Sequence, residues 1–183
     1  MRPIRAAALA AGLALLMGCA RLPKFGWRQT LDRALPMLGH RNWVCVVDSA
    51  YPLQSNPSLM TIATGADQLE VVAAVLEAID AAPHVRPVIY LDAELPHVPE
   101  SNAPGIEAYR KSLARLLKGR PVQSLPHEEI IAKLDEAGKL FRILILKTNL
   151  TLPYTSVFIQ LDCGYWSPEA QKKLEAAIEK ATR

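Results

Sequence analysis

Four charged side chains come directly after apolar stretches of the sequence, where they could do chemistry. They are Asp48, Asp92, Lys147 and Asp162. In open α/β folds, ligands bind in the crevice outside the carboxyl ends of the strands, so charged residues at such ends are candidates for a site. A carboxylate after a strand can also cap the next turn or helix, so position alone assigns a function to none of the four.

Two histidines, His40 and His127, lie at predicted helix ends and offer acid and base chemistry. Imidazole titrates close to neutral pH, so either side chain could take up or release a proton during a reaction. The alternative for His40, which follows Gly39, is a structural role in which it binds the last carbonyls of the preceding helix. His127 follows Pro126 at a helix start, and its position leaves both roles open.

Asp92, Glu94 and His97 form another group of candidate ligands. Two carboxylates and an imidazole suit a divalent metal ion, and the alternative is a solvated loop rim. We favour the loop and predict no metal site. The sequence also contains no GxGxxG, P-loop, GxSxG or HExxH motif. It therefore lacks the usual signatures of nucleotide-dependent enzymes, esterases and common metalloproteases.

Strands and helices alternate along the sequence, and these elements must position the candidate residues. Continuous apolar stretches predict strands covered on both faces, and apolar residues at helical spacing predict the helices between them. We predict strands at 43–47, 88–91, 122–125, 141–146 and 156–161, and helices at 27–38, 67–79, 106–117, 126–138 and from 167 onward. This alternation predicts one α/β domain over residues 26–183, a layered fold with a mainly parallel central sheet and helices on its faces.

The last predicted helix begins at Ser167, which suits the N-cap, and Pro168 suits the first helical position. Its apolar residues recur on one side of the helix, so we expect them to form a face buried against the domain. They are Ala170, Leu174, Ala177 and Ile178.

The N-terminal residues resemble the signal peptide of a bacterial lipoprotein. Basic residues precede an apolar run over 6–17, whose length of about twelve residues is below the ~20 needed to span a bilayer. Leu-Met-Gly-Cys19 resembles a lipobox. We therefore predict a signal peptide over 1–18, lipidation of Cys19, a tether over 19–25, and a lipid-anchored protein on the periplasmic or extracytoplasmic side of the cell envelope. The alternative is an ordinary secretory signal with a chance cysteine.

The net charge of +3, from 21 basic and 18 acidic residues, is no sign of a nucleic-acid partner. Two of the arginines belong to residues 1–18, which contain no acid, and no block of five basic residues occurs elsewhere. The rest of the chain is nearly neutral, so we predict no nucleic-acid binding. Beyond Cys19 the sequence contains only Cys45 and Cys163, which leaves one disulfide open.

Three short motifs together resemble the D-ribose pyranase and L-fucose mutarotase family. The first is Leu-Gly-His40, followed by an apolar strand and by Asp48 with a proline four residues further on. The second is Pro-His127-Glu-Glu at a helix start, and the third is Pro-Tyr154-Thr-Ser156 before an apolar strand. They occur in the family's order across roughly residues 26–165, on the predicted elements that the family uses.

The resemblance implies a function for each motif. It makes His40 the catalytic acid, and it makes Asp48, His127 and the segment Tyr154, Thr155 and Ser156 the sugar-binding residues. It implies a homo-oligomer with sites at subunit interfaces, and mutarotation, which needs no metal or organic cofactor. The reaction moves a proton off the anomeric hydroxyl and another onto the ring oxygen, and histidine suits both transfers. A ribose- or fucose-like monosaccharide is the expected partner.

The sequence departs from the family's pattern at three positions. Asn42 and Ser156 replace the usual Asp and Asn, and Leu150 stands where the family has an acid. These changes leave two hypotheses, an exported sugar mutarotase and a non-catalytic carbohydrate-binding envelope lipoprotein on the same fold. Geometry adds a condition, because eight residues of straight strand between His40 and Asp48 span about 26 Å. Either this segment bends or neighbouring subunits complete each site.

Overall fold

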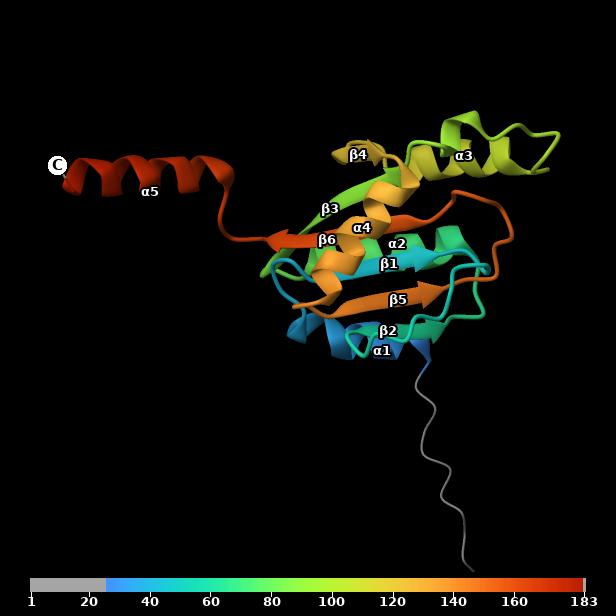
Figure 1. Cartoon of the computed structure of the whole chain (residues 1–183), viewed down its shortest axis with the longest axis horizontal. Coiled ribbons are helices and arrows are strands. Elements are labelled where there is room, and N and C mark those ends of the chain that lie inside the picture. The colour runs from blue at the N-terminus through green and yellow to red at the C-terminus, as the bar shows by residue number, and fades with distance from the viewer. Residues whose placement is uncertain (1–25, 183) are drawn as a thin grey trace, which may run out of the picture.

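A computed structural model of the protein describes residues 26–182. The predicted signal peptide and tether, with the predicted lipidation site Cys19, lie outside the described residues. Within them the chain forms a six-stranded sheet with helices on both faces (Figure 1). The strands are β1 (Trp43–Val47), β2 (Leu59–Ala63), β3 (Val85–Asp92), β4 (Val122–Leu125), β5 (Ile143–Lys147) and β6 (Val157–Cys163).

The order of the strands across the sheet is β2-β5-β1-β6-β3-β4. β6 is antiparallel to both of its neighbours, and every other neighbouring pair is parallel. The prediction of an α/β fold with a mainly parallel sheet is therefore confirmed. β2 is additional to the five predicted strands, and it forms one edge of the sheet beside β5.

Helices cover the two faces of the sheet unequally. α1, α2 and α3 pack on one face, and α4 packs on the other (Figure 1). Both cores receive side chains from β1, and all five of its residues are buried, as its continuous apolar sequence predicts. The helices are α1 (Trp27–Ala34), α2 (Gln68–Ala81), α3 (Ile106–Leu116), α4 (His127–Gly138) and α5 (Pro168–Ala181), with short 3-10 helices η1 (Leu35–Met37) and η2 (Leu95–His97).

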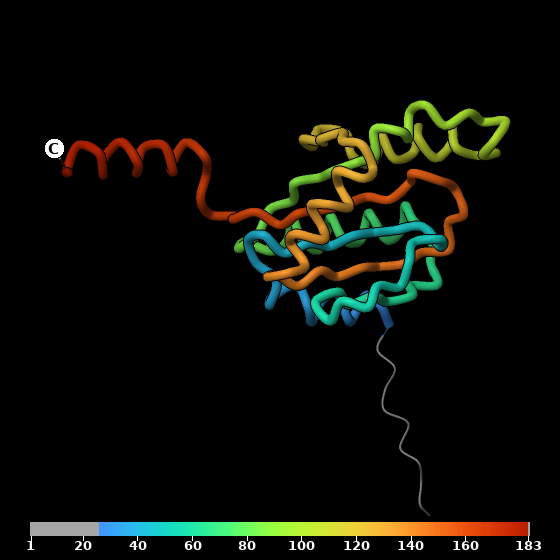
Figure 2. Tube along the Cα trace, in the orientation of Figure 1, coloured from blue at the N-terminus to red at the C-terminus, as the bar shows by residue number. Residues whose placement is uncertain are grey.

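α5 does not pack on the domain, so the prediction that it buries one face is wrong. None of its residues is buried, and Leu174 and Ile178 are 43% and 54% exposed. The chain leads away from the sheet after β6, and α5 projects from the body of the molecule (Figure 2). Apolar periodicity predicts the helix itself, because it reflects local geometry, but it does not predict which surface the apolar side meets.

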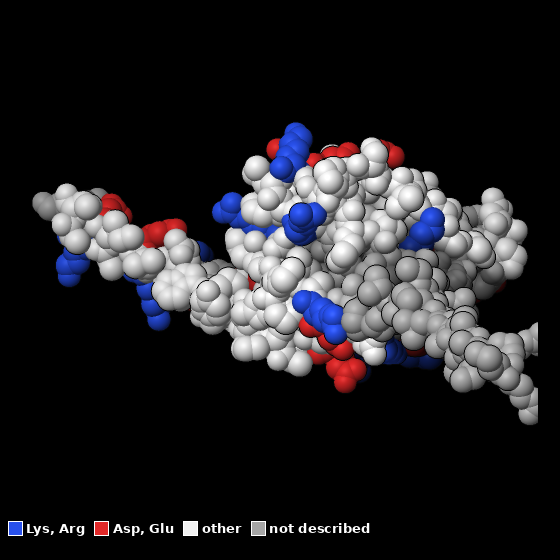
Figure 3. Space-filling view, turned by 90° about the horizontal axis from the view of Figure 1, so that it is seen from below, with Lys and Arg blue, Asp and Glu red and all other residues white. Residues whose placement is uncertain are grey.

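Three features of residues 26–182 bear on redox chemistry and partners. Cys45 is buried in β1, and Cys163 is the last residue of β6. Both thiols are free, so this structure contains no disulfide between Cys45 and Cys163. No helix in this part of the chain is both long and apolar enough to cross a membrane. Acidic and basic side chains are interspersed on the face that Figure 3 shows, so neither sign of charge dominates that surface.

Candidate functional site

Residues from distant parts of the chain meet where β1 and β3 end, because β6 is antiparallel to both strands. We call this end of the sheet the carboxyl edge. The start of β6 lies opposite the ends of β1 and β3. Ser156, just before β6, therefore lies at the same edge as Asp48, just after β1, and Asp92, the last residue of β3. β4 is parallel to β3 and ends beside Asp92, so α4 begins at this edge too and brings His127 to it.

Asp48 and Ser156 form the first polar pair of this edge. The Ser156 hydroxyl donates to Asp48 Oδ2 at 3.3 Å, and the backbone N–H of Ala50 donates to Asp48 Oδ1 at 2.8 Å. Ser156 is 2% exposed, whereas Asp48 is partly exposed. A carboxylate accepts about four hydrogen bonds, so Asp48 keeps acceptor capacity for the hydroxyl groups of a ligand.

His127 is held at this end of the sheet through both its ring and its backbone. Its Nδ1 lies 3.0 Å from Asp92 Oδ1, and its backbone N–H donates to the Glu94 carboxylate at 3.1 Å. The ring of Tyr154 meets the imidazole edge-on, with centroids 5.8 Å apart and an interplanar angle of 82°. Within residues 26–182 Nε2 makes no hydrogen bond, and 31% of the side chain is exposed. Nε2 is therefore free to meet a ligand.

Asp92 is a buried carboxylate with one unused oxygen. Its side chain is 0% exposed, and Oδ2 has no hydrogen-bond partner in the described part of the chain. Burial raises the pKa of Asp92 above its usual value, and this effect outweighs the hydrogen bond from His127, which lowers it. The sequence predicts Asp92 at a strand end but does not place it in the site, because its pairing with His127 depends on β3 and β4 being neighbours.

The segment that carries the predicted sugar-binding residues is supported from below by a buried polar network. The carbonyl of Thr155 accepts from the Tyr109 hydroxyl at 2.7 Å and from Gln68 Nε2. Gln68 Oε1 in turn accepts from the Thr148 hydroxyl at 2.7 Å. Thr155 is 0% exposed, so in this structure it holds its neighbours in place, and its contact with a sugar stays a prediction. Tyr154 beside it adopts a left-handed backbone with φ of 56° and is 41% exposed.

A cavity of about 630 Å³ opens beside His127. Two of its walls, Glu94 and Tyr154, are also contacts of His127, so the cavity lies next to His127. Asp48, Asp92, His127 and Ser156 do not line it themselves. The lining residues are Ala93, Glu94, His97, Val98, Pro99, Asn102, Pro153 and Tyr154.

Asp92, Glu94 and His97 do not form a metal site in this structure. Asp92 and Glu94 both bind His127, one through its ring and the other through its backbone, while His97 lines the cavity. No group of three or more His, Cys, Asp or Glu residues within 26–182 could hold a metal ion.

Lys147 and Tyr51 complete this edge of the sheet. Lys147 Nζ donates to the Tyr51 carbonyl at 2.6 Å, so its charge is engaged in fixing the loop after β1. The Tyr51 hydroxyl is buried without a partner in the described residues. Burial first, and then negative charges that include Asp48 and Asp92, raise the pKa of Tyr51 well above its usual range.

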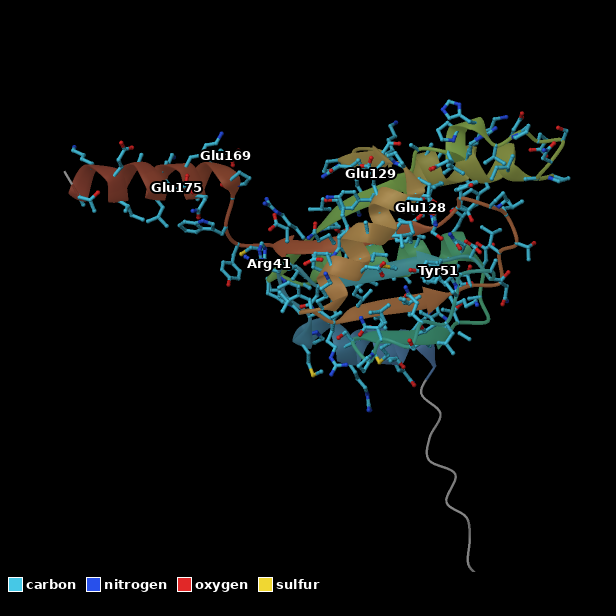
Figure 4. The ribbon with its side chains drawn as sticks, in the orientation of Figure 1. Arg41, Tyr51, Glu128, Glu129, Glu169 and Glu175 are labelled. Atoms are coloured by element: carbon cyan, nitrogen blue, oxygen red, sulfur yellow. The ribbon has the colours of Figure 1, made fainter. Side chains whose placement is uncertain are left out.

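His40 and Asp162 lie at the opposite end of the sheet from this site. His40 Nδ1 is 3.0 Å from Asp162 Oδ1, and Arg86 Nε donates to Asp162 Oδ2 at 3.0 Å. Burial raises the pKa of Asp162, but the hydrogen bonds from Arg86 and His40 outweigh it, so the net pKa is lowered. Figure 4 shows the separation, with Arg41 labelled at the start of β1 and Tyr51 beyond its end. β1 is straight, and one chain does not bring His40 to Asp48.

Residues 28–164 match the model of the RbsD / FucU transport protein family. The chain belongs to this family. The match contains every candidate site residue from His40 to Ser156, and it ends before α5.

A solved structure of an RbsD protein shares the fold, and two further structures are similar more weakly. RbsD from Bacillus subtilis, complexed with D-ribose, aligns with a TM-score of 0.52 and 20% identity, over 80% of this chain and all of the other. FucU from Bifidobacterium longum aligns with a TM-score of 0.49 and 18% identity, over 72% and 92% of the two chains. The fucose mutarotase from Streptococcus pneumoniae, in complex with L-fucose, aligns with a TM-score of 0.48 and 17% identity, over 76% and 96%. Curated proteins give no significant sequence match.

Proposed function

We propose that the protein binds a ribose- or fucose-like monosaccharide at the carboxyl edge of β1 and β3 and interconverts its anomers or ring forms. The observation that carries this proposal is the convergence of Asp48, Ser156, Tyr154 and His127 at one edge, in a chain that belongs to the RbsD / FucU family. The structure of the Bacillus subtilis relative, which contains D-ribose, supports a sugar as the ligand.

The chemistry of these side chains suits a cyclic sugar. Asp48 and Ser156 offer a carboxylate and a hydroxyl to the sugar hydroxyls, and Tyr154 offers a half-exposed ring beside them. Mutarotation then removes the proton of the anomeric hydroxyl, protonates the ring oxygen, and closes the ring again on the other face. Imidazole groups perform both transfers near neutral pH, and the reaction consumes no cofactor.

His40 enters this proposal from a second copy of the chain. Within one chain it lies at the far end of β1 from Asp48 and binds Asp162. A homo-oligomer that places this end of one copy against the carboxyl edge of another would supply His40 as the catalytic acid. Symmetric assemblies of identical chains are the usual form of soluble oligomers, so one interface repeated around a ring completes every site.

Saturation-transfer NMR on D-ribose and L-fucose tests the function directly. The wild-type protein is expected to accelerate exchange between the anomers, and Asp48→Asn is expected to lose both sugar binding and acceleration. Asp32→Asn, an exposed position in α1, serves as the matched control and keeps the wild-type rate. Binding without acceleration would instead support the second hypothesis, a non-catalytic carbohydrate-binding protein, which the departures at Asn42, Leu150 and Ser156 leave open. If the protein neither binds a sugar nor accelerates its anomer exchange, both functions are contradicted.

Export and lipid anchoring remain a separate proposal that the N-terminal sequence supports. We expect the mature protein to begin at Cys19, to carry lipid there, and to face the periplasm or cell exterior. Intact-mass spectrometry of protein from the membrane fraction would show cleavage before Cys19 and the added acyl mass, and Cys19→Ala would release the protein from membranes. An unmodified N-terminus in the soluble fraction would contradict the anchor.

A further inference from the structure

The contacts of His127 engage one ring nitrogen, Nδ1, and leave the other, Nε2, without a hydrogen-bond partner in the described residues. Asp92 holds Nδ1 at 3.0 Å, and Glu94 holds the backbone N–H at the start of α4. The edge of Tyr154 limits rotation of the ring. Nε2 alone is unengaged, on a side chain that is about one-third exposed beside the cavity. The two contacts of the ring, with Asp92 and with Tyr154, leave Nε2 as the ring nitrogen without a partner in the described residues.

Asp92 is costly for the fold unless it serves such a purpose. A buried carboxylate loses its hydration, and one of its oxygens finds no hydrogen-bond partner within residues 26–182. The oxygen that is paired binds Nδ1 of His127. When Asp92 is ionised, it accepts a hydrogen bond from Nδ1 only if Nδ1 carries a proton. The lone pair of the neutral ring then lies at Nε2. If Nε2 takes up a proton, the buried negative charge of Asp92 stabilises the resulting imidazolium.

We propose that Asp92 is a positioning residue that makes His127 the catalytic base of the sugar interconversion. This inference rests on the proposed function and extends it, since the resemblance alone makes His127 a sugar-binding residue. It also explains why the same edge carries Asp48 in a partly exposed position and Asp92 in a buried one. The exposed carboxylate meets sugar hydroxyls, and the buried carboxylate acts only through His127.

In the proposed ring opening, His127 accepts one proton and His40 of a second copy donates one. Nε2 of His127 takes the proton from the anomeric hydroxyl, and the electron pair of that O–H bond forms the carbonyl at C1. The bond between C1 and the ring oxygen breaks, and its electron pair stays on that oxygen, which takes a proton from the acid that the proposed function supplies, His40 of a second copy. After rotation about C1–C2 the steps run in reverse on the other face of the carbonyl, so both histidines return to their original protonation states.

The first test compares Asp92→Asn with the wild type by NMR exchange of D-ribose and L-fucose anomers over a range of sugar concentrations. We expect kcat to fall about 10- to 100-fold while KM stays within about threefold, because a neutral amide accepts the hydrogen bond without stabilising an imidazolium. Asp135→Asn, an exposed carboxylate in α4, is the matched control and keeps the wild-type values.

A second test separates positioning from a merely structural role. In the background of His127→Gln, Asp92→Asn is expected to change kcat no further, because Asp92 acts only through the imidazole. Nitrogen-15 shifts of His127 are expected to show the Nδ1-protonated tautomer in the wild type and a mixture of tautomers in Asp92→Asn. The melting temperature of Asp92→Asn should not fall below that of the wild type, since the substitution removes a buried charge.

The outcomes distinguish this inference from the function on which it rests. If the wild type does not accelerate anomer exchange, the proposed function fails first. If the wild type accelerates exchange and Asp92→Asn matches it, or if both substitutions reduce kcat independently, the positioning role is overturned. A wild-type His127 protonated at Nε2 would overturn it as well.

Discussion

Ser156 and Asp48 bind each other and can each accept further hydrogen bonds. Ser156 and Asp48 are 108 positions apart in the chain and share one hydrogen bond, in which Ser156 is the donor. The serine oxygen can still accept, and the carboxylate has acceptor positions left. A sugar hydroxyl can donate to the remaining acceptor positions of Asp48, the more exposed of the two side chains. The pair therefore keeps oxygen atoms that can accept hydrogen bonds from a sugar, and its contribution to sugar affinity can be measured.

Ser156→Ala should weaken sugar binding without unfolding the protein. The substitution removes the hydroxyl that donates to Asp48 and that we propose accepts from a sugar hydroxyl. A neutral hydrogen bond contributes about 0.5–1.5 kcal/mol, so its loss corresponds to a rise of about 2- to 13-fold in Kd. Titration calorimetry or NMR titration with D-ribose and L-fucose would measure it. Ser124→Ala, at an exposed position of β4, should leave Kd unchanged. An unchanged Kd in Ser156→Ala would remove Ser156 from the site.

Asn42, one of the departures from the family's pattern, has a structural explanation. Its Oδ1 accepts from the backbone N–H of Gly39 at 2.8 Å, and its Nδ2 donates to the Arg142 carbonyl at 2.9 Å. An aspartate could not make the second bond, because it has no N–H. Asn42 thus ties the turn that carries His40 to the start of β5, and the charge beside His40 comes from Asp162 instead.

At the scale of elements, the start of α4 decides where His127 lies. Pro126 precedes the helix without a side-chain cap, and the Glu94 carboxylate from the segment after β3 accepts from the first helical N–H instead. This contact satisfies one of the free N–H groups of the helix and places negative charge at its N-terminus, where the helix dipole favours it. The helix that positions His127 is therefore capped by Glu94, a residue that also lines the cavity.

Glu94→Ala should destabilise the protein by about 1–2 kcal/mol, the cost that is usual for loss of an N-terminal cap. Urea unfolding followed by circular dichroism would measure the free energy of unfolding. Glu129→Ala removes a carboxylate from the same first turn at an exposed position and should cost less than about 0.5 kcal/mol. Equal losses in the two variants would show that general charge near the helix, and not the contact with His127, supports α4.

α5 should contribute little to the stability of the described domain. It buries no residue, and an isolated helix of 14 residues is marginal in water. Truncation after Ser167 should therefore leave the melting temperature within about 2 °C of the wild type. Hydrogen exchange should show unprotected amides in α5 and strong protection in α4. A drop of several degrees on truncation would mean that α5 packs on a surface outside the single chain.

At the scale of the whole molecule, the sheet separates the two histidines. His127 lies at the carboxyl edge of β1 and β3, and His40 lies at the other end with Asp162 and Arg86. The strands between them are straight and paired on both sides, so no small shift within one chain joins the two ends. A site that uses both must therefore be assembled from two copies.

Mixing His40→Ala with Asp48→Asn tests this assembly. Each variant alone is expected to be inactive in the anomer-exchange assay. Co-refolded at equal concentration, they should regain about a quarter of the wild-type activity, because each site draws on two copies and about one site in four receives both intact residues. Light scattering on the same samples would confirm that the chains associate. No recovery in a mixed oligomer would show that two copies do not share a site.

Local elements of this fold can be predicted from the sequence because they depend on neighbouring residues. β1 at 43–47 and β4 at 122–125 have the predicted bounds, and α4 begins within one residue of its prediction. Apolar patterning and the residues that start and stop helices act over a few positions, so the sequence shows them directly. The same reasoning predicts that Asp48 follows a strand and that His127 begins a helix.

Pairings between distant residues could not be predicted, because they depend on strand order and direction. The antiparallel course of β6 brings Ser156 to Asp48 and takes Asp162 to the other end. The parallel pairing of β3 with β4 brings His127 to Asp92. The sequence by itself determined which residues can do acid and base chemistry and on which elements they lie. Only the tertiary structure decided which of them meet, because long-range strand pairing, and not local periodicity, sets the distances between them.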